Sequence, residues 1–255
     1  MNRILKYVML DIVKSKLVIG YTLILALLSW SLFSLEDNSA KAVLSLTNVV
    51  LLVVPLVTVI FSTIYMYNAA EFIELLASQP LKRVSIWTGF FLGLSAALVT
   101  ALILGLGLPL LLYADFAMAA VLLTTGIMMS LIFVSLGLWV SSMTRDKARG
   151  ISTAIFVWLF FAVLFDGLML LLLFQFSDYP IEKTMIGLTA FSPVDLCRIL
   201  ILLQLDVSAL MGFTGALFRD FFGSTKGEWV AFGLLTLWVV IPFYFSTKKF
   251  RLKDL

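Results

Sequence analysis

The residue whose position most directly suggests chemistry is Asp166. It is the one charged residue in the run 150–177, which is otherwise apolar and long enough to cross a bilayer. An ionised carboxylate near the middle of a bilayer costs about 3 kcal/mol even on lenient insertion scales. Two solutions stay open: a neutral carboxyl bridging helices, or a carboxyl that faces a wet cavity or a subunit interface. Because no span offers a cation to pair with it, Asp166 is a functional candidate.

A second group of polar residues follows that run. Ser192 can cap a helix, Pro193 suits the first helical position, and Asp195 stands where a capping-box acid would stand. The helix then passes Arg198 and is rich in Leu and Ile. A second apolar piece, 207–218, is too short to span a bilayer. Both pieces are expected in or near the outer interface, where they either pack on the bundle or dock an extracytoplasmic partner.

The sequence offers few residues that could support catalysis or bind a metal. The chain has no histidine and one cysteine, which excludes an internal disulfide, a His-based triad and a zinc site of the usual kind. A phosphate-binding GxxxxGK[ST] loop is absent, and no second intramembrane carboxylate completes an aspartyl dyad. A Ser–Lys pair stays formally open. We therefore expect no catalytic residues and no metal site, and too few soft ligands for the chain to carry copper ions itself.

The elements that position these residues are helices in lipid. With 62% hydrophobic and 13% charged residues among 255, the chain exceeds the apolar fraction of soluble domains. We predict an all-α polytopic membrane protein, forming a single transmembrane domain. A helix over 1–16 lies in the interface, because its apolar stripe alternates with Lys and Arg. Six spans follow, at 17–35, 42–70, 84–114, 116–144, 150–177 and 229–247, with an outer segment at 178–228.

The distribution of Lys and Arg orients the spans. The connections on the side of both termini hold 13 of these residues and those on the other side hold 5, which together make the full 18. Cytoplasmic connections carry the excess of positive charge. We therefore predict that both termini are cytoplasmic.

The stretch 71–83 is a short charged segment between two spans on the cytoplasmic side. Its spacing predicts an amphipathic helix with Phe72, Leu75 and Leu76 on one face and Glu71, Glu74 and Ser78 on the other. Pro80 ends the helix, since proline lacks the N–H and disfavours helical geometry in the residue before it. Two interpretations remain: an element that receives a push from a soluble partner, or an ordinary surface loop.

The layout and several short motifs resemble the ABC-2 type permeases. Pro80-Leu81-Lys82-Arg83 followed by Gly89 is similar to the P-L-x-R…G pattern after that family's coupling helix. The stretch from Trp158 to Phe165-Asp166, with Pro193-Val-Asp195-Leu-Cys-Arg198, is similar to the permeases that serve maturation of nitrous oxide reductase, a copper enzyme. Phe90 stands where a basic residue often follows the glycine, and Asn68-Ala-Ala-Glu71 lacks the family's glycines there.

The resemblance implies a fold, partners and roles. The fold would be an ABC-2 (type V exporter-like) permease in a bacterial inner membrane. It would form a homodimer with a cytoplasmic ATPase, which binds the ATP and Mg, and a periplasmic β-helix protein. The ATPase-facing residues would be Glu71, Glu74, Leu75, Pro80, Leu81 and Arg83. Asp166 would lie in the transmembrane dimer, and the outer partner's region would hold Ser192, Pro193, Asp195 and Arg198. Alternatives are an exporter of lipid, drug or ion, and an intramembrane enzyme or membrane scaffold.

Overall fold

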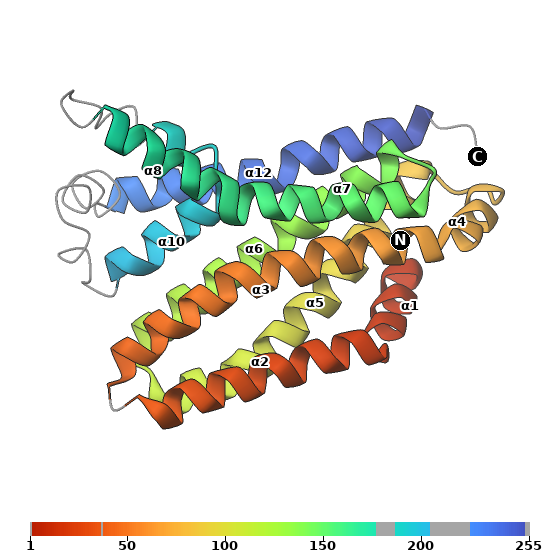
Figure 1. Cartoon of the computed structure of the whole chain (residues 1–255). Helices are drawn as coiled ribbons and strands as arrows, with labels where there is room; N and C mark the ends of the chain where they lie inside the picture. The colour runs from red at the N-terminus through yellow and green to blue at the C-terminus, as the bar shows by residue number, and fades with distance from the viewer. Residues whose placement is uncertain (1, 37, 177–186, 205–224, 253–255) are drawn as a thin grey trace.

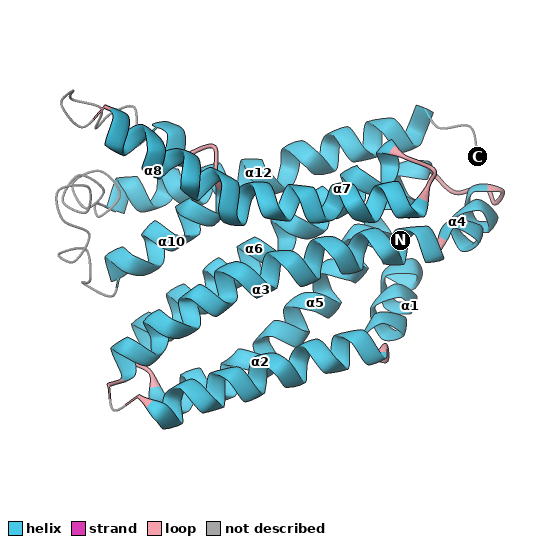
Figure 2. Ribbon diagram, in the orientation of Figure 1, coloured by secondary structure: helices cyan, strands magenta, loops and turns pink. Residues whose placement is uncertain are grey.

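A computed structural model describes residues 2–36, 38–176, 187–204 and 225–252, and within these ranges every regular element is a helix (Figures 1 and 2). Six helical segments of the described chain are long and apolar enough to cross a membrane. The prediction of an all-helical chain with six spans is thereby confirmed. These segments are α2 (Lys16–Leu35), α3 (Ser39–Asn68), α5 (Arg83–Tyr113), α6 (Phe116–Met143), the continuous α7–η1–α8 segment (Lys147–Gln175) and α12 (Thr225–Leu252).

Three shorter helices complete the described fold. α1 (Asn2–Val13) precedes the first span, α4 (Ala70–Ala77) joins α3 to α5, and α10 (Pro193–Gln204) follows the fifth span. In Figure 1, α1 and α4 lie at one end of the bundle, whereas α10 lies toward the opposite end beside α8 and α12. The second apolar piece expected at 207–218 lies outside the described residues.

Local side-chain hydrogen bonds fix where several helices begin. The hydroxyl of Ser15 accepts from Val18 N at the start of α2, and the carboxylate of Asp146 accepts from Ala148 N at the start of α7. Each cap satisfies one of the N–H groups that the first turn leaves without an intrahelical partner. These caps turn the chain sharply at the ends of the spans.

The core of the bundle is built around α5 and α6. Phe90 and Leu102 on α5 and Phe133 on α6 are fully buried. Gly105 on α5 allows α2 to approach closely, because a methyl group there would lie 2.8 Å from Leu25 Cβ. Small residues at helix contacts are the usual means of close packing in membranes.

The fifth span is interrupted just before Asp166. Its helical stretches α7 (Lys147–Leu159) and α8 (Phe165–Gln175) are joined by η1 (Phe160–Leu164), which is a π-helical turn. π-Bulges inside helices are frequently found at functional sites. The bulge sets the direction from which the Asp166 side chain leaves the helix.

Candidate functional site

α4 presents a charged and partly apolar surface at one end of the bundle. Glu71 and Glu74 are exposed, and among the described residues neither side chain has an ion pair or hydrogen bond. Leu75 was predicted on the inner face, but its exposed fraction is 65%. Leu76 is buried and Phe72 packs against the core, as predicted, and Ile73 is buried in place of Leu75. Leu75 therefore lies on the exposed side of α4, beside the two glutamates.

The chain leaves α4 earlier than Pro80 alone predicts. The helix ends at Ala77, and the Ser78 hydroxyl donates to Leu75 O at 2.8 Å. Pro80 and Leu81 follow in an exposed turn, and α5 begins at Arg83. We call residues 69–83 the elbow.

The elbow is tied to the far end of the chain through the start of α5. Arg83 Nη1 donates to Arg251 O at 3.1 Å, and Trp87 Nε1 donates to Ser246 Oγ at 2.8 Å. The Trp87 ring also stacks on Phe250, with ring centroids 4.3 Å apart. The start of α5, which follows the elbow, is therefore in direct contact with the end of α12.

A second connection runs from the elbow to α1. The rings of Tyr7 and Phe72 lie 5.2 Å apart. α1 lies directly on α5, since a methyl group at Gly89 would come within 2.9 Å of Ile4 Cγ2 and one at Gly93 within 2.7 Å of Val8 Cγ1. The two glycines make a GxxxG pair, a spacing that lets helices approach closely.

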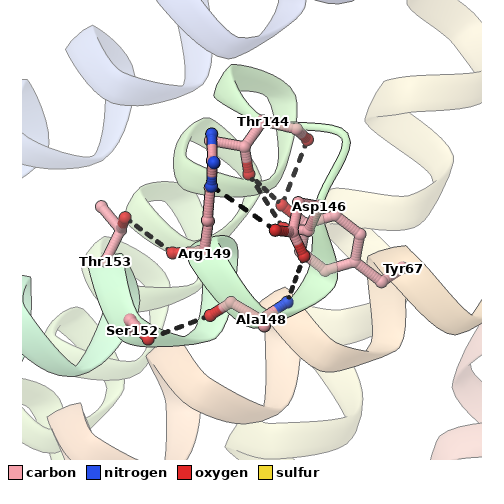
Figure 3. Close-up of polar contacts among 7 residues, drawn as sticks. All are labelled: Tyr67, Thr144, Asp146, Ala148, Arg149, Ser152 and Thr153. Atoms are coloured by element: carbon pink, nitrogen blue, oxygen red, sulfur yellow. Dashed lines mark hydrogen bonds and ion pairs between the residues drawn. The ribbon is translucent and has the colours of Figure 1, made fainter.

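A third connection joins the elbow to the turn between α6 and α7 (Figure 3). The hydroxyl groups of Tyr67 and Thr144 lie 2.6 Å apart, and the Tyr67 hydroxyl also donates to Thr144 O at 3.2 Å. Beside them, Lys147 Nζ donates to Asn68 Oδ1 at 2.7 Å. Tyr67 and Asn68 immediately precede the elbow. These hydrogen bonds therefore hold the end of α3, which leads into the elbow, against the turn between α6 and α7.

A hollow lies behind α4. Its volume is about 280 Å³, and its walls come from α3, α4, α5, α6 and α12. Glu74 and Arg145 line it together with Ser141 and Ser142. The helix that carries the exposed glutamates is thus not packed solidly against the bundle along its whole inner side.

The other charged group lies inside the bundle. Arg198 Nη1 lies 2.8 Å from each carboxylate oxygen of Asp166 and 3.1 Å from Asp195 Oδ1. The Asp166 and Arg198 side chains are each 31% exposed, and that of Asp195 is 10% exposed. We call Asp166, Asp195 and Arg198 the charge cluster. The missing cation for Asp166 comes from α10, outside the spans.

The position of α10 corrects the expectation that this segment lies at the outer interface. Trp238 Nε1 donates to Ala190 O at 3.2 Å, and Cys197 Sγ lies 3.9 Å from Thr125 O. At 1.5 Å per residue, Trp238 stands about 16 Å from the Gly227 end of its span, and Thr125 about 14 Å from the start of α6. Ala190 and α10 therefore lie alongside the middle of α12 and α6 rather than beyond the ends of these helices.

Burial changes the interpretation of the residues that were predicted to lie in the outer partner's region. Ser192, Pro193 and Asp195 are buried, and Arg198 faces Asp166 rather than a surface partner. The capping prediction is confirmed, because Ser192 Oγ accepts from Asp195 N at 3.2 Å and α10 starts at Pro193. These residues hold α10 in place instead of presenting a docking surface.

Some residues that organise the site are absent from the predictions. The GxxxG spacing of Gly89 and Gly93 is visible in the sequence and marks a close helix contact. The link from Trp87 to Ser246 and Phe250 has no local signal, because it joins residues about 160 positions apart. The pairing of Asp166 with Arg198 likewise needed the position of α10.

Comparison with known proteins settles the family. The model for the ABC-2 family transporter protein matches residues 69–255, which include the elbow, the fifth span and α10. The chain belongs to the ABC-2 transporter family. A Pseudomonas aeruginosa protein named "Probable ABC transporter permease protein NosY" is 27% identical over 208 residues, covering 77% of this chain and 74% of the relative.

Membership of the ABC-2 family indicates the kind of protein to which the elbow and the charge cluster belong. The chain is a membrane-embedded permease subunit of an ABC transporter, similar to NosY, and a transport subunit rather than an enzyme. ABC permeases work with ATPase partners. An exposed surface at one end of the helices is therefore a candidate binding site for such a partner.

Proposed function

We propose that this chain couples ATP hydrolysis by a cytoplasmic, NosF-like ATPase to work done across a bacterial inner membrane, through the elbow. The observation that carries the proposal is the exposed tip of α4. Two glutamates without described partners lie there next to a leucine that is 65% exposed. An isolated exposed leucine is ordinary. One flanked by two unpaired acids, on a helix between spans of an ABC-2 permease, suits a partner groove with basic edges.

The contacts of the elbow support a route for the motion. Pressure on α4 would be passed to α12 through Arg83 and Trp87, and to α1 through the ring of Phe72. The hollow of about 280 Å³ behind α4 leaves room for that displacement. Packed helices move as rigid bodies rather than deforming, so a push at one end reaches the whole span. In this mechanism both termini are cytoplasmic.

We further propose that the working unit is a homodimer that meets through the α7–η1–α8 face. Only 11% of the most apolar stretch of this span is buried, against 50% or more for α3, α5 and α6. Lipid could cover its leucines, but lipid is a poor cover for an ion pair whose two side chains are each 31% exposed. A second copy, with or without water between the copies, would shield the charge cluster.

The similarity to NosY suggests the finer role. We propose that the transporter serves maturation of nitrous oxide reductase with a NosD-like periplasmic β-helix partner. In that role it exports a small species, with sulfur-containing ones among the candidates, or transmits motion to the partner. The scarcity of soft ligands favours either over passage of copper ions. A stoichiometric copper site in the purified permease would contradict this.

Co-purification tests the coupling role. A tagged chain expressed with its ATPase should retain it, and the double variant Glu71→Lys/Glu74→Lys should lose most of it. A matched control neutralises two acids at the other end of the bundle, Glu36→Gln/Asp115→Asn, and should retain the ATPase. Equal capture by all three proteins would refute the elbow as the docking surface.

A further inference from the structure

The charge cluster has one more acid than base. Both carboxylates approach the same atom, Arg198 Nη1, so they lie against each other as well as against the guanidinium. With both acids ionised the cluster would carry one net negative charge. Its immediate neighbours Phe165, Val194 and Leu196 are buried and apolar. Two carboxylates sharing one site in such surroundings resist double ionisation.

One oxygen of the Asp195 carboxylate has no described hydrogen-bond donor when the group is ionised. Asp195 is 7% exposed, and its Oδ1 atom accepts from Arg198. Its Oδ2 atom is buried and has no hydrogen-bond partner among the described residues. A buried charged oxygen without a partner is costly. A proton on Asp195 would turn the carboxyl into a donor, and the neighbouring acceptor is Asp166, which approaches the same Arg198 Nη1 atom.

Within the described part of the chain, the helices packed against α10 bring no other charged group to the cluster. α10 packs against α3, α6, η1 and α12. α6 and η1 contain no charged residue, while Lys41 in the first turn of α3 and Glu228 in the first turn of α12 are exposed. The charged groups that act on Asp195 are those of Asp166 and Arg198. Among the described residues, no further cation lies near the cluster, and a bound proton is the remaining way to remove its excess negative charge.

We propose that Asp195 and Asp166 together bind one proton, carried on Asp195 and donated to Asp166, with Arg198 paired to the remaining carboxylate. The proton makes the cluster neutral as long as Asp195 and Arg198 on α10 stay within reach of Asp166 on α8. A movement that separates the two helices would leave Asp195 without its acceptor and expose it to exchange with water. Transport steps that move α10 would then take up or release a proton. The proposal is independent of whether an ATPase docks at the elbow.

Infrared spectroscopy of the full chain in lipid tests the proton directly. At a pH well above the ordinary carboxyl pKa of about 4, exposed acids are ionised and show no carbonyl stretch of a protonated acid. We expect one such band in the native chain, shifted in heavy water, and its loss in Asp195→Asn. The control Asp115→Asn, at an exposed acid, should keep the band. Absence of the band from the native chain, or its persistence in Asp195→Asn, would overturn the proposal.

Thermal unfolding gives a second readout of the same proposal. Asparagine has the shape of a protonated aspartic acid and can donate to Asp166, so Asp195→Asn should unfold within a few degrees of the native chain. In Asp166→Asn the charge that balances Arg198 must come from Asp195, which ionises a carboxyl with a buried oxygen that has no described partner, so this variant should unfold at a clearly lower temperature. Equal destabilisation by both variants would mean that Asp195 is ionised, and would contradict the shared proton.

Discussion

The elbow and the charge cluster both combine acids with arginine, yet they use charge in opposite ways. At the elbow Glu71 and Glu74 are exposed and have no described partner, whereas Asp166 and Asp195 are held by one arginine atom inside the bundle. Exposed charges contribute little to stability and are available to another molecule. Charges inside a bundle must be compensated by the chain itself. The comparison supports the proposal that the elbow binds a partner and that the cluster serves the permease itself.

The largest effect is expected from Arg198→Gln. The variant leaves a carboxylate without its counter-charge in the bundle, and removing one partner of a buried pair typically costs about 3–5 kcal/mol. The 31% exposure of Arg198 places the expected cost at the lower end. Unfolding of the purified chain in mixed micelles measures it.

The matched control is Arg149→Gln. Arg149 is 82% exposed and pairs with Asp146 at 3.5 Å (Figure 3). Surface pairs of this kind contribute about 0–1 kcal/mol. If the two arginine variants were equally stable, the cluster would not be an internal structural unit.

Trp87→Ala should have the next effect, and it should act on coupling as well as stability. The variant loses the stack on Phe250 and the hydrogen bond to Ser246, and large-to-small changes of this kind cost about 3 kcal/mol. Trp87→Phe keeps a ring and should cost about 1 kcal/mol. Trp229→Ala, at a side chain that is 75% exposed, is the control.

ATPase assays of the assembled transporter separate the two contributions. Trp87→Ala should keep the ATPase bound but lose transport-linked stimulation of hydrolysis, because the elbow no longer moves α12. Normal stimulation in this variant would remove α12 from the route.

Gly93→Ala tests the close approach of α1 and α5. The added methyl would meet Val8 Cγ1 at 2.7 Å and Val8 Cβ at 2.8 Å, so one helix must shift. Overpacking of this kind costs about 1–3 kcal/mol. Gly20→Ala meets nothing within 4 Å and should be neutral or stabilise by up to about 1 kcal/mol. Comparing the unfolding of the two variants shows whether the glycine contact matters.

The smallest expected effect is that of an Asp166 variant on capture of the ATPase. It tests whether the elbow and the charge cluster are separate units. Asp166→Ala should leave capture of the ATPase unchanged, because the charge cluster belongs to α8 and α10, which lie away from the end of the bundle that carries α4 (Figure 1). The same variant should impair transport. Loss of ATPase capture in Asp166→Ala would show that the cluster and the elbow are not separate units.

The spans were predictable because their signal is one-dimensional. Uncharged runs of about 20 residues or more can cross a bilayer only as helices, and each predicted span has a helical counterpart. The inner face of α4 was less predictable. Phe72, Ile73, Leu75 and Leu76 give an eight-residue helix two possible apolar stripes, and only its contacts with the bundle bury Ile73 and leave Leu75 exposed.

The position of α10 could not be predicted from its own sequence. A twelve-residue apolar helix with Asp195 and Arg198 looks interfacial, because isolated charges favour water. The charges are instead satisfied by each other and by Asp166, which lies 32 residues from Arg198. The sequence did show that no span offers a cation to pair with Asp166. It did not show that the partner would be Arg198 on α10.

Labelling of Leu75→Cys tests the central claim most directly. The single native cysteine, Cys197, is buried, so Cys197→Ala provides a clean background. A membrane-impermeant thiol reagent should label Cys at 75 in inside-out vesicles but not in intact cells, and the bound ATPase should protect it. Labelling from the outside, or labelling that the ATPase leaves unchanged, would contradict a cytoplasmic elbow that receives the ATPase.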